Sequence, residues 1–219
     1  THVAGTIAAS MNRRGVVGVA PAARLYAVKV LNSRGSGYTS GILNGLAWCY
    51  RYGMHVVNLS LGSGATTHST NNYSRAYENA GRLLRRRGIL PVAAAGNSGA
   101  TSRPYVGNPA RCPSFMAVSS IDCNRRRSPF SSYGPQVEIC APGTNVWSTF
   151  PPTGYRQLSG TSMAAPHVAG VAALVKRRYP SWTGDRIRVH LWRTAMDLGY
   201  PGRDWLFGYG QVRAYPAVR

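Results

Sequence analysis

The stretch LSGTSMAAPHVAG, residues 158–170, decides how the chain around it folds. It continues as a segment that is apolar nearly all round a helix, so this helix is expected to be buried. Gly160 lets the backbone pass close to a neighbour, and Pro166 is expected in the first turn, where a missing N–H costs little. The basic run 176–178 suits the negative end of the helix dipole, and Pro180 ends the helix.

Strand-like and helix-like stretches alternate along the rest of the chain. Strands are expected at 24–31, 55–62, 89–97, 114–121 and 137–143, and helices at 35–53, 71–88, 162–180 and 183–199. Such alternation predicts an α/β fold, with a parallel sheet covered by helices on both faces. Sites in such sheets gather beyond the carboxyl ends of the strands, where we place the turns 60–62, 96–99 and 142–144. The 219 residues contain no repeat or linker and form one domain.

The charge of the chain is strongly unbalanced, with 26 Lys and Arg against 6 Asp and Glu. A net charge of +20 is compatible with a polyanionic partner. The arginine clusters at 85–87, 125–127 and 177–178 are short, however, and none is interleaved with aromatic residues in the sequence. We therefore do not expect nucleic acid to be the partner, and the simpler interpretation is a solvated basic surface.

Four cysteines, Cys49, Cys112, Cys123 and Cys140, allow three disulfide pairings, and the sequence does not choose among them. One pair can be excluded: Cys112 and Cys123 flank an expected strand that would hold them about 20 Å or more apart. No CxxC pair is present, so a metal or redox role is not favoured.

Ser162 lies where a loop becomes the buried helix. A hydroxyl at the positive end of a helix is well placed to act as a nucleophile, although a helix cap is the commoner role for such a serine. Asn97, in the turn AAAGNSG (93–99), would present an amide N–H as a second donor to a developing oxyanion.

Taken in order with NLSLGSG (58–64) and the opening THVAGT (1–6), these segments resemble the subtilisin-like serine proteases, the subtilases, over essentially the whole chain. The resemblance implies Ser162 as nucleophile and Asn97 in the oxyanion hole. It also implies a residue set for binding substrate. One pocket wall would be Ser60, Leu61 and Gly62, the other Ala94, Ala95 and Gly96, with Gly107 beside them and Gly35, Ser36 and Gly37 as a strand that pairs with substrate. Asn108–Pro109 matches a position where relatives often have a cis bond.

Other serine hydrolases fit less well. The G-x-S-x-G elbow of the α/β-hydrolases fails at Ala164, and the relatives that pair serine with Glu and Asp carry an Asp where this chain has Asn97.

The family's catalytic base is the first histidine of H-G-T-H-V-A-G-T, and this chain starts at the T. His2 matches the second, structural histidine, and the family's Asp would lie further upstream. His167 is about 140° round the helix from Ser162, and His55, His68 and His190 are weak substitutes. We therefore expect residues 1–219 to be the carboxyl two-thirds of a subtilase catalytic domain, without its N-terminal strands and inactive alone. The alternative is a non-catalytic module that binds peptides.

The resemblance also implies a polypeptide substrate, an N-terminal prosegment, export from the cell and no membrane segment. No cofactor is expected in this chain, and binding of calcium is left open for the full-length protein. The loop Ser10–Val16 matches a calcium loop of relatives, but Arg13 and Arg14 are poor neighbours for a cation, so we expect no tight site in this chain.

Overall fold

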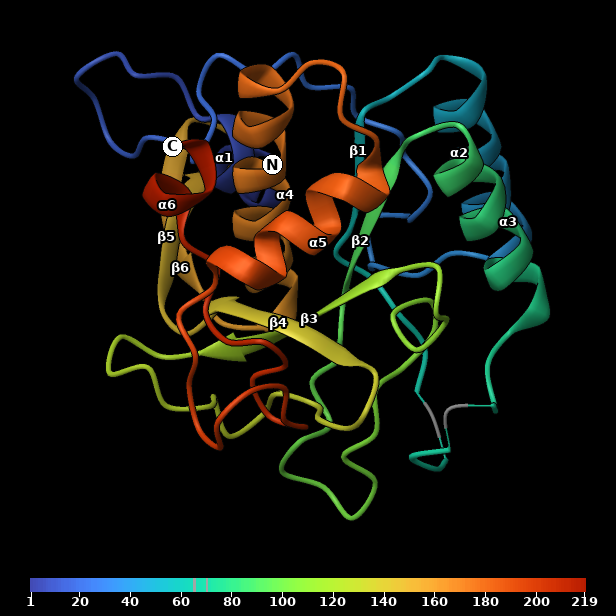
Figure 1. The fold of residues 1–219 in the computed structure, drawn as a ribbon. Helices are drawn as coiled ribbons and strands as arrows, with labels where there is room; N and C mark the ends of the chain where they lie inside the picture. The colour runs from blue at the N-terminus through green and yellow to red at the C-terminus, as the bar shows by residue number, and fades with distance from the viewer. Residues whose placement is uncertain (65, 70) are drawn as a thin grey trace.

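The computed structural model describes residues 1–219 except 65 and 70, and its centre is a parallel sheet of four strands (Figure 1). The strands are β1 (Val56–Leu59), β2 (Leu90–Ala94), β3 (Met116–Ile121) and β4 (Val137–Pro142), adjacent in that order. The register sets Val57 opposite Pro91, Ala93 opposite Ala117 and Ser119 opposite Cys140. The predicted α/β class with a parallel sheet is therefore confirmed.

Helices cover both faces of this sheet, as predicted. On one side lie α2 (Thr39–Arg51) and α3 (Arg75–Arg86), and on the other α4 (Thr161–Arg178) and α5 (Gly184–Thr194). Strand β2 shows why the sheet needs both layers. Its alternate residues Leu90 and Val92 pack beneath α4 and α5, whereas Ala93 packs beneath α2 and α3.

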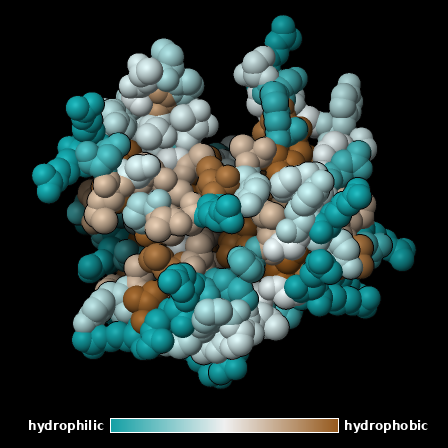
Figure 2. All heavy atoms as spheres, turned by 90° about the horizontal axis from the view of Figure 1, so that it is seen from above, coloured by the Kyte–Doolittle hydropathy of each residue, from teal (hydrophilic) through white to brown (hydrophobic). Residues whose placement is uncertain are grey.

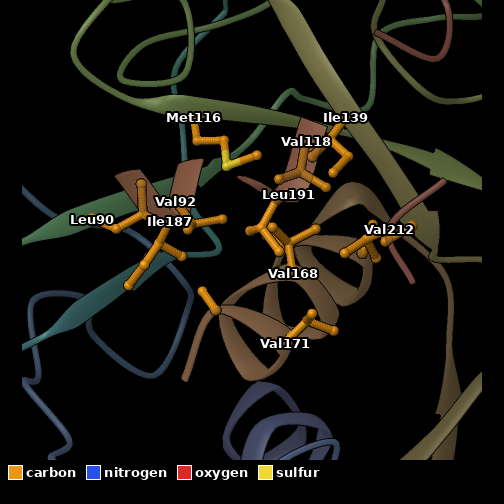
Figure 3. Close-up of a cluster of buried hydrophobic side chains, with 14 of the residues drawn as sticks. Leu90, Val92, Met116, Val118, Ile139, Val168, Val171, Ile187, Leu191 and Val212 are labelled. Atoms are coloured by element: carbon orange, nitrogen blue, oxygen red, sulfur yellow. The ribbon is translucent and has the colours of Figure 1, made fainter. Parts of the chain in front are cut away.

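Helix α4 crosses the molecule next to the sheet and forms the centre of one core. Val168 lies beside Val118 of β3 and Leu191 of α5 (Figure 3), Val171 belongs to the same cluster, and none of these side chains is exposed by more than 3%. This packing explains why the helix is apolar on nearly all sides.

The hairpin of β5 (Val146–Phe150) and β6 (Gly154–Leu158) and the short helices α1 (His2–Ala8) and α6 (Ala214–Val218) complete the fold. No sequence pattern predicted the hairpin. Helix α1 packs against α4 and β5, and His2 Nε2 lies 3.0 Å from the carbonyl oxygens of both Val146 and Arg156. This histidine therefore ties the start of the chain to the hairpin.

The strand expected at 24–31 is wrong. The segment is extended but joins no ladder in the described part of the chain, and Leu25 and Tyr26 are 45% and 54% exposed. A parallel strand requires a neighbour that pairs with its backbone, and no described segment takes that place. Strand β1 is consequently an edge of the sheet.

A buried ion pair links the sheet to α5. Arg188 Nε donates to Glu138 Oε2 at 2.7 Å, and its Nη2 also donates to the Phe115 carbonyl oxygen at 3.2 Å. Both charged side chains are only 7% exposed. Removing either partner would leave the other charge buried without compensation.

None of the helices in the described residues combines the length and apolarity needed to cross a membrane.

Candidate active site

The twelve residues predicted for the site all line one groove with a volume of about 660 Å³. They are Gly35, Ser36, Gly37, Ser60, Leu61, Gly62, Ala94, Ala95, Gly96, Asn97, Gly107 and Ser162. The groove lies where β1 and β2 end and α4 begins, at the carboxyl edge of the sheet. Among the described residues that line it, none carries a charged side chain, although the chain as a whole has a net charge of +20.

Ser162 is the second residue of α4, after the N-cap Gly160. The first N–H groups of a helix have no partner within the helix, and no described acceptor pairs with the N–H of Ser162. Its hydroxyl makes one long hydrogen bond, donating to the Ser60 carbonyl oxygen at 3.4 Å. The serine thus offers the groove both a weakly held hydroxyl and a free N–H.

The amide of Asn97 is oriented by Thr161. Its Oδ1 accepts from the Thr161 N–H at 2.9 Å and from the Thr161 hydroxyl at 3.0 Å. Since the N–H can only donate, the atom facing it must be oxygen, and Nδ2 is the free end of the amide. The Gly96 N–H donates to the hydroxyl oxygen of Thr161 at 3.1 Å. This bond leaves the hydroxyl proton of Thr161 free to point toward Asn97. Sequence reasoning missed Thr161, which is 1% exposed and adjacent to Ser162.

The two donors meet beside Gly160. A Cβ built on this glycine would lie 3.3 Å from Asn97 Nδ2 and 3.7 Å from the Ser162 nitrogen. Glycine leaves that space open, so a ligand oxygen placed there would face both donors. This arrangement can stabilise an oxyanion next to the hydroxyl of Ser162.

Pro166 was expected in the first turn of α4 but is its sixth residue. Its missing N–H therefore removes the bond that the Ser162 carbonyl oxygen would accept within the helix. Ser60 replaces this bond: its hydroxyl donates to the Ser162 oxygen at 2.7 Å and lies 3.0 Å from Asn58 Nδ2. A side chain at the end of β1 thus fixes the first turn of α4.

The wall that contains Gly62 and Gly107 is held together by backbone contacts. The Ser63 N–H donates to the Asn108 carbonyl oxygen at 2.9 Å, and a Cβ on Gly107 would lie within 2.1 Å of the Ser63 oxygen. Glycine at 107 thus allows two segments to approach closely. The Asn108–Pro109 bond is cis, as predicted.

Two further expectations concern segments next to the groove. Gly35, Ser36 and Gly37 line the groove, and Gly35 lies in a turn closed by the Asn32 N–H, which donates to the Ser36 carbonyl oxygen at 2.8 Å. Their pairing with a substrate strand stays a prediction. The turn 142–144 follows β4 at the carboxyl edge of the sheet, as expected, but it does not line the groove. It supports the site from behind, where the Gly160 N–H donates to the Gly143 carbonyl oxygen at 2.8 Å.

Comparison of the chain with known proteins identifies its family. The model of the Subtilase family matches residues 1–210. The chain belongs to the subtilase family. It is 53% identical over 219 residues to the M-protease of Shouchella clausii, of which it covers 54%, and 52% identical to Subtilisin Savinase of Lederbergia lenta, of which it covers 77%. Both alignments include the whole of this chain. The chain therefore spans about half the length of the M-protease and about three quarters of that of Subtilisin Savinase. The crystal structure of a lanthipeptide protease superposes with a TM-score of 0.85 at 29% identity, covering 100% of this chain and 74% of the other.

In this subtilase chain none of the five histidines, all of which are described, lines the groove. His167 Nδ1 lies 2.8 Å from the Met163 carbonyl oxygen of its own helix, and burial lowers the pKa of its imidazole. His190 Nε2 lies 2.9 Å from the Ala217 carbonyl oxygen. His68 packs edge-on against Tyr105, with ring centroids 4.4 Å apart, and burial also lowers its pKa.

All four cysteines are free, so Cys112 and Cys123 are not bonded, as predicted, and none of the other pairings occurs. Burial raises the pKa of the Cys112 thiol to about 12. The described residues contain no group of three or more His, Cys, Asp or Glu side chains that could hold a metal. In the loop that matches the calcium loop of relatives, Asn12 Oδ1 accepts the N–H of Arg14 at 3.1 Å, and the neighbouring arginine side chains are unfavourable for a cation.

Proposed function

We propose that the complete protein is a serine endopeptidase that cleaves peptide bonds through an acyl-enzyme on Ser162. The observation that carries this proposal is the convergence of Asn97 Nδ2 and the Ser162 N–H on the space beside Gly160. The Ser162 oxygen would attack the scissile carbonyl while its proton passes to a base and then to the leaving amine. Water would then hydrolyse the ester, and the two donors would hold the oxyanion in both steps.

We propose that the base is not among the histidines described above, because none of them lines the groove. Without one, Ser162 is an ordinary alcohol, so we propose that residues 1–219 alone are inactive and that a histidine and its orienting carboxylate come from elsewhere in the protein. The alternative is a module that binds peptides without cleaving them. The same groove would serve that function, and only the presence of a base separates the two.

The substrate side chain before the scissile bond is proposed to be large and apolar. The uncharged lining, including Ala94 and Tyr105, offers no carboxylate to an Arg or Lys side chain. A prosegment and export from the cell, in both cases by resemblance to the family, are parts of the same proposal.

Labelling of the intact protein with a fluorophosphonate tests the proposal directly. The expected result is one adduct, on the peptide containing Ser162, together with cleavage of a protein substrate at internal bonds. Ser162→Ala should abolish both, and Asn97→Ala should lower kcat by about 10² to 10³. Peptide binding without any adduct or cleavage would support the non-catalytic alternative instead.

A peptide series that varies only the residue before the scissile bond tests the specificity. Phe or Leu should give the highest kcat/KM, and a profile dominated by Arg or Lys would contradict the role of the uncharged groove.

A further inference from the structure

The edge of the sheet opposite the groove collects basic and aromatic side chains from four helices. Helices α2, α3 and α4 run antiparallel to the strands they cover and therefore end at this edge, whereas α5 follows α4 directly and begins there (Figure 1). We call the surface formed by residues 50–52, 85–87, 176–179 and 182–186 the amino-edge face.

Contacts between the helix ends make this face continuous. The guanidinium carbon of Arg87 lies 5.2 Å from the ring centre of Tyr50, which joins α3 to α2. The Gly184 N–H donates to the Gly88 carbonyl oxygen at 2.8 Å, which joins α5 to the end of α3. A Cβ on Gly184 would lie 2.6 Å from the Leu90 nitrogen, so only glycine allows this close approach.

A layered stack of side chains lies next to this junction. The rings of Tyr179 and Trp182 are parallel within 9°, with centroids 4.0 Å apart. Arg186 lies 4.3 Å from the Trp182 ring centre and Arg178 lies 5.1 Å from that of Tyr179. A guanidinium held on a ring loses less freedom when it binds an anion and keeps its N–H groups for the ligand.

A single carboxylate offsets the positive charge of this face. Its only carboxylate, Asp185, already accepts from Arg85 Nε at 2.6 Å. Arg51, Arg86 and Arg177 are exposed and have no carboxylate partner in the described part of the chain. Figure 2 views the molecule from this side and shows strongly hydrophilic side chains projecting between apolar patches.

Aromatic rings are exposed among these cations. Tyr52 is 58% exposed and lies 4.5 Å from the Trp48 ring, and Tyr50 is 39% exposed. Part of this interleaving is local, because Arg51 lies between Tyr50 and Tyr52, whereas Arg86 and Arg177 come from other helices.

We propose that the amino-edge face binds single-stranded nucleic acid, with the arginines on the phosphates and the exposed tyrosine rings on the bases. Cations that track a backbone combined with rings that stack on unpaired bases are the physical requirements for such binding. A duplex offers the same phosphates but hides its bases, so the exposed rings favour a single strand. The proposal does not depend on the proposed peptidase activity.

The test measures binding of a labelled 20-nucleotide single-stranded DNA of mixed sequence to the intact protein by fluorescence anisotropy. Ser162→Ala prevents self-cleavage in every sample. In this background the triple variant Arg51→Gln, Arg86→Gln and Arg177→Gln should raise Kd at 50 mM salt about tenfold or more. It should also reduce the slope of log K against log salt by about 2, since each phosphate contact contributes about 0.7.

The matched control is Arg103→Gln, Arg126→Gln and Arg193→Gln, which also removes three exposed positive charges but from outside this face. Its Kd and salt slope should stay close to those of the parent. Equal losses in the two triple variants would overturn the proposal and point to diffuse attraction by the net charge. Thermal midpoints equal to that of the parent show that both variants are folded.

Tyr52→Ala separates base stacking from charge. It should weaken single-stranded DNA about fivefold or more while leaving the affinity for heparin unchanged. If Tyr52→Ala changes neither affinity, and duplex or heparin binds as well as the single strand, the face recognises only charge and the proposal fails.

Discussion

The hydroxyl of Thr161 should matter to catalysis chiefly by orienting Asn97, and it also accepts the Gly96 N–H. Thr161→Val keeps the shape and the N–H that Asn97 Oδ1 accepts, but it removes the hydroxyl that donates at 3.0 Å. A neutral hydrogen bond contributes about 1 kcal/mol, so kcat of the intact protein should fall about five- to tenfold. The whole Asn97 donor contributes about 3 kcal/mol, which sets the upper limit of the effect. KM should not change, because the oxyanion exists only in the transition state.

Steady-state hydrolysis of a chromogenic peptide measures the effect. Thr161→Ser keeps the hydroxyl and should stay within about twofold of the parent. In the Asn97→Ala background, Thr161→Val should cause a smaller loss of kcat than in the parent, since the amide it orients is absent and only the acceptor of the Gly96 N–H is removed. An unchanged kcat in the single variant, or an equal loss in both backgrounds, would refute the reasoning.

Three further outcomes follow from the contacts. Glu138→Gln leaves its guanidinium partner buried and charged, and urea unfolding should show a loss of about 3 kcal/mol; an unchanged midpoint would contradict this. Ser60→Ala should lower the free energy of unfolding by about 1 kcal/mol, because the Ser162 carbonyl oxygen loses its donor. The loss should be smaller in a Pro166→Ala background, where the N–H of residue 166 can donate to the same oxygen, and equal losses in both backgrounds would show that this N–H does not replace the Ser60 hydroxyl. Ellman's reagent at pH 8 should modify Cys123 alone in the native protein and all four thiols after denaturation, because the others are buried and the Cys112 pKa is raised to about 12; a second fast-reacting thiol would disprove the burial.

Much of the sheet could be predicted because its strands are determined locally. The run 89–95 is apolar on both faces and bounded by turns, which fits only an interior strand. The segment 24–31 has a similar pattern but forms no strand, because pairing depends on a neighbour that local sequence does not contain. The hairpin 146–158 was missed for the opposite reason: Trp147 and Tyr155 are largely exposed, so no buried pattern indicates it.

The residues of the site also fall into those that local sequence predicts and those that depend on contacts across the fold. Ser162 and Asn97 could be predicted because each lies in a short stretch with distinctive glycines. Thr161 could not, since its partner is 64 residues away in the sequence and its role depends on a hydrogen bond across the fold. Pro166 was expected in the first turn but lies just beyond it. At that position its missing N–H leaves the Ser162 carbonyl oxygen without a helical donor, and the Ser60 hydroxyl donates to it instead.

Helix α4 has a geometric consequence beyond packing. Its 18 residues span about 27 Å, with Ser162 near one end and Arg178 at the other. A molecule adsorbed to an acidic surface through the arginine end would therefore stand with its groove facing outward. Immobilisation on an anionic resin should leave the groove as accessible to large solutes as it is in free solution.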